Sequence, residues 1–109
     1  MKILFDQGVP KPLQARLAPH EIQRAFQLVS ATKKNGELLS LAEAAGFDVL
    51  VTTDQNLRYQ INLQNRKLAA FILSRGNWPQ ISPCAAEVAS KIKAIRKPEL
   101  YICTIPPSA

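Results

Sequence analysis

The sequence predicts one α/β domain spanning residues 1–109, built on a mainly parallel sheet that helices cover on both faces. Short apolar runs alternate along the chain with segments of helical periodicity, which is the pattern of strands joined by crossover helices. The runs at 49–53 and 68–73 are nearly continuous in apolar character, as expected of strands buried on both faces. A chain of 109 residues is also too short to divide into two independent cores.

Five segments are expected in the first third of the chain. Residues 3–5 are a short apolar strand, and residues 6–8 form the turn that ends it. A helix is expected over 10–18, because this segment opens with prolines, spaces its leucines at i, i+4 and is followed by another proline. Residues 21–26 are a weaker strand candidate, and residues 27–34 are expected to form a loop or an irregular turn.

A second helix and a strongly apolar strand follow in the middle of the chain. Leucines and alanines between 38 and 45 repeat at i, i+3, i+4 and i+7, with Asn35 available as a cap and Gly46 as the terminator. Residues 49–53 are uncharged and rich in β-branched side chains, which predicts a buried strand. Residues 56–65 are expected to hold a short helix.

The last third of the chain predicts a strand, a helix and a strand. Residues 68–73 form a buried strand, and a loop with Trp and Pro at 78–79 follows it. Ser82, as a cap, and a proline at the first helical position open a helix whose apolar residues stay in register to Ile95. Residues 100–105 are the last strand, which two prolines close.

Charge and composition favour an anionic partner. Lys and Arg number 14 against 8 Asp and Glu, a net charge of +6, which favours nucleic acid first, an anionic membrane surface second and an acidic protein third. A solvated basic face accounts for this charge equally well. The chain opens without a signal-peptide pattern and has no apolar run long enough to cross a bilayer, so we expect a cytoplasmic protein without a membrane partner.

Cysteine and histidine chemistry is not expected. Cys84 and Cys103 show neither metal-ligand spacing nor a disulfide framework, so two reduced thiols without an activating neighbour are predicted. His20 is the only histidine and has no obvious Ser or Cys partner, so we assign it no catalytic role.

Three acidic residues are candidates for a metal site. Asp6 and Asp54 each follow an apolar strand directly, on the side where a parallel sheet opens its functional crevice. Glu37 lies in the first turn of the helix before the strand that leads to Asp54, and it reaches the same edge if the preceding loop carries it there. Converging carboxylates repel one another unless a cation neutralises them, and oxygen ligands select a hard ion such as Mg²⁺ or Mn²⁺. The alternative is structural: two turn-forming aspartates and a glutamate at a helix N-terminus.

Three segments of the chain resemble one protein family: residues 1–10 (MKILFDQGVP), 35–39 (NGELL) and 51–57 (VTTDQNL). Their order and spacing are similar to those of small stand-alone PIN-like proteins, which often are toxin components of toxin–antitoxin pairs. The likeness covers nearly the whole chain. It implies a three-layer α/β/α fold with a parallel sheet of about five strands. It also implies a metal-dependent ribonuclease in which Asp6, Glu37 and Asp54 are the catalytic acids and hold Mg²⁺ or Mn²⁺.

The sequence departs from the family at Asn56, where PIN nucleases commonly carry a fourth acid. An asparagine can offer a carbonyl oxygen to a metal or position a water, but it adds no negative charge. A site with one charge fewer is expected to bind Mg²⁺ more weakly. The resemblance also implies an antitoxin-like protein as a partner beside RNA.

Six further residues are candidates for binding RNA, because they offer positive charge or an aromatic ring near the expected site: Lys33, Lys34, Arg58, Tyr59, Arg75 and Trp78. Surface positions, or packing over the sheet edge, account for these residues as well. For Trp78 we favour a plug of the sheet end or a subunit contact in a homodimer.

Two functions are therefore carried forward. The first is a metal-dependent endoribonuclease in which an ion-bound water attacks the phosphodiester. The second is a PIN-like module that has lost this chemistry and binds RNA or a protein. A phosphoacceptor receiver domain is less favoured, because Asp6 lacks an adjacent acid, and a dinucleotide-binding role is less favoured still, because no Gly-x-Gly-x-x-Gly run is present.

Overall fold

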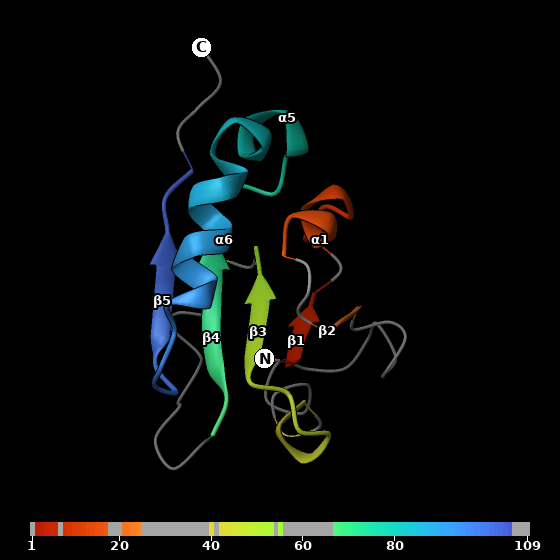
Figure 1. The fold of residues 1–109 in the computed structure, drawn as a ribbon, viewed down its shortest axis with the longest axis vertical. Helices are drawn as coiled ribbons and strands as arrows, with labels where there is room; N and C mark the ends of the chain where they lie inside the picture. Colours follow the sequence, from red (N-terminus) through yellow and green to blue (C-terminus); the bar gives the residue numbers. More distant parts are fainter. Residues whose placement is uncertain are drawn as a thin grey trace.

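The sheet at the centre of the molecule has five strands that are all parallel (Figure 1). The computed structural model describes residues 2–6, 8–17, 21–24, 40, 42–53, 55 and 67–105. The strands are Lys2–Phe5 (β1), Glu21–Arg24 (β2), Val49–Thr52 (β3), Ala69–Leu73 (β4) and Leu100–Cys103 (β5). They lie side by side in the order β2-β1-β3-β4-β5. The predicted α/β class and the parallel sheet of about five strands are confirmed.

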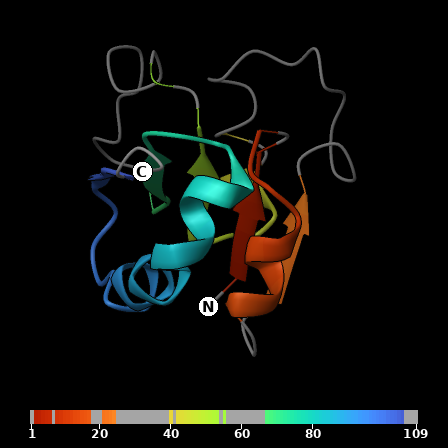
Figure 2. The same cartoon turned by 90° about the horizontal axis from the view of Figure 1, so that it is seen from above.

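Three helices cover one face of this sheet (Figure 2). They are α1 (Pro12–Arg16), α5 (Trp78–Ile81) and α6 (Ala85–Lys93). Alternate strand residues, such as Phe5 and Phe71, point into this face and are buried against the apolar sides of these helices. This cluster is the larger part of the core, because it extends from β1 to β5.

The opposite face of the sheet carries a second, smaller cluster. The strand residues of this face, Leu4, Leu50 and Ile72 among them, are buried together with Ala42 and Phe47 from the segment before β3. Both faces of the sheet are thus apolar, as the nearly continuous apolar runs of the sequence predict. The second helical layer of the predicted three-layer fold falls largely outside the described residues and stays a prediction.

The helical segment before β3 ends in the way the sequence predicts. Residues 40 and 42–44 are helical, and Gly46 follows with a positive φ of 86°. The Gly46 N–H donates to the Glu43 carbonyl over 3.1 Å, and the Phe47 N–H donates to the Ala42 carbonyl over 3.0 Å. These two bonds form a Schellman motif, which satisfies carbonyls at the helix end, and Phe47 and Ala42 are buried in the same apolar cluster.

The region from 78 to 84 differs from the sequence prediction. Trp78 and Pro79 open the short helix α5 rather than a loop, and a 3₁₀ turn, η1 (Ser82–Cys84), separates α5 from α6. Ser82 makes no side-chain cap, and α6 begins only at Ala85. The reason lies in Pro83, whose nitrogen cannot donate into an α-helical ladder; the chain therefore tightens into a 3₁₀ turn before the helix resumes.

The other boundaries agree with the predictions to within two residues. The strand expected at 21–26 is described over Glu21–Arg24, and the last strand ends at Cys103 rather than at residue 105. The predicted loop at 27–34, the cap at Asn35 and the short helix at 56–65 lie outside the described residues.

Replacement of Gly46 tests the helix end. A Cβ at this position would meet nothing within 4 Å, so the substitution changes backbone conformation without a clash. We expect Gly46→Ala to lower the free energy of unfolding by about 1–2 kcal/mol, because a left-handed φ is unfavourable for an L-residue. Gly46→Asn should cost less, since Asn tolerates this region. Urea denaturation of both variants measures the difference; equal stabilities of the Ala variant and the wild type would contradict the prediction.

Candidate functional site

The strand order reverses between β1 and β3, and the carboxyl ends of these two strands are the expected place for a functional crevice. In the sheet, the strand that follows β1 in the chain, β2, lies on the outer side of β1, whereas the strand that follows β3, β4, lies on the opposite side of the β1–β3 pair. The two strands are directly paired, with Phe5 opposite Val51. The next residue of each, Asp6 and Thr52, therefore lies at the same edge of the sheet.

A hydrogen bond joins the Asp6 carboxylate to the end of β3. The Thr52 hydroxyl Oγ1 donates to Asp6 Oδ2 over 2.8 Å, and the Asp6 backbone N–H donates to the Val51 carbonyl over 2.9 Å. Thr52 is only 1% exposed, and among the described residues it is the one buried polar side chain. A buried hydroxyl needs a partner. Here the partner is the carboxylate, so the bond satisfies Thr52 and fixes the orientation of Asp6.

The segments that follow β1 and β4 meet the residue that follows β3. A Cβ on Gly8 would overlap the Thr53 hydroxyl oxygen. A Cβ on Gly76 would lie 2.9 Å from the Gly8 carbonyl oxygen and 3.1 Å from Thr53 Cγ2. Only glycine permits backbones and side chains to approach this closely. The segment after β4 is therefore packed against the turn that follows Asp6.

Polar side chains also link neighbouring strands at this edge. Gln55 Nε2 donates to the carbonyl of Leu73, at the end of β4, over 2.6 Å. Ser74, the next residue, accepts a hydrogen bond at Oγ from the Ile105 N–H over 2.6 Å, and so links β4 to the segment after β5. Together with the bond at Asp6, these contacts link each neighbouring pair from β1 to β5. They fix the positions of the described residues that directly follow these strands relative to one another.

Two of the six residues predicted to bind RNA are described, and both follow β4 on this edge. Arg75 is exposed and directly precedes Gly76. Trp78 is the first residue of α5, and its half-buried side chain packs against the larger core cluster. The remaining four lie outside the described residues: Lys33, Lys34, Arg58 and Tyr59.

Of the predicted metal ligands, Asp6 alone belongs to the described part of the chain. Glu37, Asp54 and Asn56 lie outside it. Among the residues that the structure describes, no group of three or more Asp, Glu, His or Cys side chains could hold a metal ion. The convergence of the three acids therefore stays a prediction, and the established feature of the site is Asp6 with its Thr52 partner.

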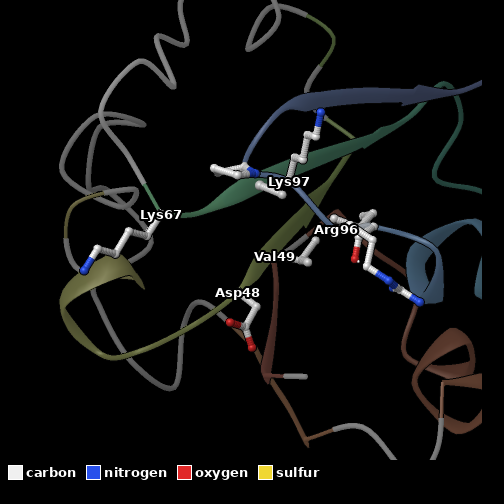
Figure 3. Close-up of a pocket in the computed structure, with 8 residues that line it drawn as sticks. Asp48, Val49, Lys67, Arg96 and Lys97 are labelled. Atoms are coloured by element: carbon white, nitrogen blue, oxygen red, sulfur yellow. Dashed lines mark hydrogen bonds between the residues drawn. The ribbon is translucent and has the colours of Figure 1, made fainter.

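A hollow of about 290 Å³ opens at the opposite, amino edge of the sheet (Figure 3). Asp48, Lys67, Arg96 and Lys97 contribute to its lining, and three of these are basic. The Arg96 guanidinium turns back to donate to two carbonyls near the end of α6 over 2.6 and 3.0 Å, and Lys67 points the other way (Figure 3). Because the basic groups do not converge, this hollow lacks the geometry of an anion site.

Both cysteines are free, as the sequence predicts. Cys103 is buried in β5, whereas Cys84 is half-buried in η1. Burial raises the pKa of the Cys103 thiol; Lys91 opposes this shift, while Cys84 and Glu87 add to it. A thiol kept in its neutral form is a poor nucleophile, so Cys103 is a structural residue.

Comparisons with protein-family models, with curated proteins and with solved structures found no significant match. None of the helices in the described ranges is long and apolar enough to span a bilayer. The carboxyl edge, where Asp6 is bonded to Thr52, is therefore the structural feature on which a functional proposal can be built.

Sequence reasoning missed three residues that shape this edge: Thr52, Gln55 and Gly76. Thr52 was detectable in principle, because it is a polar residue at the end of a buried strand and stands two positions before a candidate acid. The contact of Gly76 with Gly8 joins residues far apart in the chain. Nothing in the local sequence indicates it.

The packing of Gly8 on Thr53 predicts strong coupling between these positions. We expect Gly8→Ala to lower the free energy of unfolding by about 1–3 kcal/mol, because the new methyl group overpacks against the threonine hydroxyl. Thr53→Ala removes that oxygen and should recover most of the loss, whereas Thr53→Ser keeps it and should not. A double-mutant cycle by urea denaturation measures the coupling. Additive effects of Gly8→Ala and Thr53→Ala would show that the two residues do not touch.

Alkylation of the folded protein tests the two thiols. We expect iodoacetamide at neutral pH to modify Cys84 much faster than Cys103, because burial and a raised pKa keep Cys103 as a protected, neutral thiol. Mass spectrometry of proteolytic peptides measures each site. In denaturant without reductant both should react; failure of either to react there would reveal a disulfide.

Proposed function

We propose that the protein is a metal-dependent endoribonuclease of the PIN type, using Mg²⁺ or Mn²⁺, and that it acts as the toxin of a toxin–antitoxin pair. The observation that carries the proposal is the place of Asp6. It stands at the carboxyl end of β1, next to β3, where the strand order reverses and where open α/β sheets build their sites. The buried Thr52 hydroxyl fixes its carboxylate.

The donor chemistry of this edge suits a hard divalent ion. Asp6 supplies carboxylate oxygen, which is the ligand that Mg²⁺ and Mn²⁺ prefer. In the sequence, Asp54 stands between Thr53 and Gln55, two residues at the same edge. We assign Asp6 and Asp54, with Glu37 and Asn56, as the residues that would hold the ion. The bound ion would activate a water and stabilise the charge that develops on the phosphodiester.

The surroundings of Asp6 support RNA as the substrate. The chain carries a net charge of +6, which attracts a polyanion. Arg75 is exposed on the segment that Gly76 packs against the turn after Asp6, so it can contact a phosphate beside the acid. An antitoxin-like partner and a cytoplasmic location belong to the same proposal.

One observation favours a second candidate, a PIN-like module that binds RNA or a protein without cleaving it. Asn56 stands where the family commonly has a fourth acid, so the proposed site carries one negative charge fewer. Weaker metal binding would follow from this loss.

Cleavage of single-stranded RNA distinguishes the two candidates. The nuclease should cut a panel of RNAs with Mn²⁺ or Mg²⁺ and stop on addition of a chelator. Asp6→Asn and Asp54→Asn should abolish cleavage and leave RNA binding intact, because binding depends on Lys and Arg. Asn56→Asp should raise the activity, since it restores the fourth charge. Inactivity of both wild type and Asn56→Asp, with RNA still bound, would establish the binding module instead.

Two variants separate the charge of Asp6 from its hydrogen bond. Asp6→Asn removes the charge but keeps an oxygen that can accept from Thr52, so its stability should stay close to that of the wild type. Thr52→Val keeps the carboxylate but removes the hydroxyl that donates to it, and we expect it to reduce metal affinity about 10–100-fold, the usual effect of losing an outer-shell partner. Calorimetric titration with Mn²⁺ measures this affinity. Full cleavage by Asp6→Asn would assign Asp6 a purely structural role.

A further inference from the structure

Strand β5 is an open edge of the sheet, with no described strand beyond it. The Ser74 N–H donates to the Cys103 carbonyl over 2.9 Å, so Cys103 directs its carbonyl towards the β4 side. Successive residues of a strand direct their backbone groups to opposite sides. Leu100 and Ile102 therefore point their N–H and C=O groups away from β4, where another strand could bind them.

Ile102 is also exposed as a side chain. It is 47% exposed, and among the described residues it is the only large hydrophobic side chain that is exposed. Natural edge strands are usually protected by their shortness, by charged residues, by prolines or by bulges. The sequence of β5, Leu-Tyr-Ile-Cys, contains no charge and no proline. An outward-facing backbone and an exposed apolar side chain thus coincide at Ile102, in an edge strand whose four residues include no charge and no proline.

Helix α6 places a charged pair beside this edge. Lys93, on one flank of the helix, shares a hollow with Arg16 of α1. Glu87 and Lys91 lie on the other flank, and both act on the thiol of Cys103 in β5, whose pKa is raised by burial, lowered by Lys91 and raised by Glu87. The two side chains are exposed and paired with each other, with 3.5 Å between Lys91 Nζ and Glu87 Oε1.

We propose that the β5 edge is a homodimer interface, at which a second copy of this chain pairs its own β5 in antiparallel orientation across a two-fold axis beside Ile102. The two strands would lie about 4.8 Å apart and join both sheets into one. Leu100 and Ile102 would gain a strand partner for the outer backbone groups that no described strand pairs. Ile102 would pack against the partner's Ile102, which covers the exposed apolar side chain on each copy.

The two-fold axis also makes the charged pairs of α6 self-complementary. Helix α6 runs antiparallel to the strands (Figure 1), so the two copies of the helix would run in opposite directions on one face of the joined sheet. Glu87 would then face the partner's Lys91, and Lys91 the partner's Glu87. This reciprocal match is the property of an isologous interface, and it favours a second copy over a strand from a different protein. The inference is independent of the proposed nuclease activity.

Sedimentation velocity over a concentration series tests the interface with the full chain. We expect the wild type to dimerise and Ile102→Lys to be monomeric throughout, because two lysines would meet at the axis. Ser90→Lys adds the same charge at an exposed position of α6 outside the interface, and it should dimerise like the wild type. Circular dichroism checks that each variant is folded.

Charge exchange on α6 provides the sharper test. Glu87→Lys and Lys91→Glu change the net charge in opposite directions, yet each should weaken the dimer several-fold by opposing like charges across the axis. The double exchange restores opposite charges and should restore most of the affinity. A monomeric wild type, a dimer indifferent to Ile102→Lys, or a double exchange no better than the single ones would overturn the proposal. In the case of a monomeric wild type, the remaining occupant for the β5 edge would be a strand of another protein.

Discussion

Burial of β3 and β4 on both faces is the constraint on which the rest of the structure depends. Every residue of these two strands is buried, so a polar group within them must find its own partner. Thr52 is the one polar residue of these two strands. It meets the condition because it is the last residue of β3 and its hydroxyl donates to the Asp6 carboxylate. Polar chemistry is thereby confined to the ends of the strands, and the sheet acts as an apolar support for its two edges.

The two edges use their acids differently. At the amino edge, Asp48 accepts the Lys2 backbone N–H over 2.8 Å and Glu43 accepts the Lys67 N–H over 3.0 Å, so both acids satisfy backbone donors where strands begin. At the carboxyl edge, Asp6 is bonded by a side-chain hydroxyl beside the reversal of strand order. This contrast is the reason to look for chemistry at Asp6 rather than at the hollow beside Asp48.

The sequence was sufficient for the strands and for the glycine-terminated helix, because both depend on local patterns. Continuous apolar runs predict β3 and β4, and Gly46 predicts the helix end. It was insufficient where two local signals competed: Ser82 has the chemistry of a cap, but Pro83 turns the chain into η1 instead. The candidate site was predictable only as far as single strand ends, which locate Asp6. The bond from Thr52 and the packing of Gly8, Thr53 and Gly76 depend on how distant segments meet, and local patterns carry no such information.

The packing of Gly8, Thr53 and Gly76 restricts which substitutions this sequence can accept in evolution. A larger residue at Gly8 is tolerated only after a reduction at Thr53, whereas a larger residue at Gly76 also meets the backbone carbonyl oxygen of Gly8, which no side-chain change removes. We expect natural variants of this protein to carry a side chain at position 8 only where position 53 is smaller, and to keep glycine at position 76. The turn beside Asp6 and the segment that carries Arg75 would therefore be inherited as one unit, although β4 and β1 lie at distant points of the sequence.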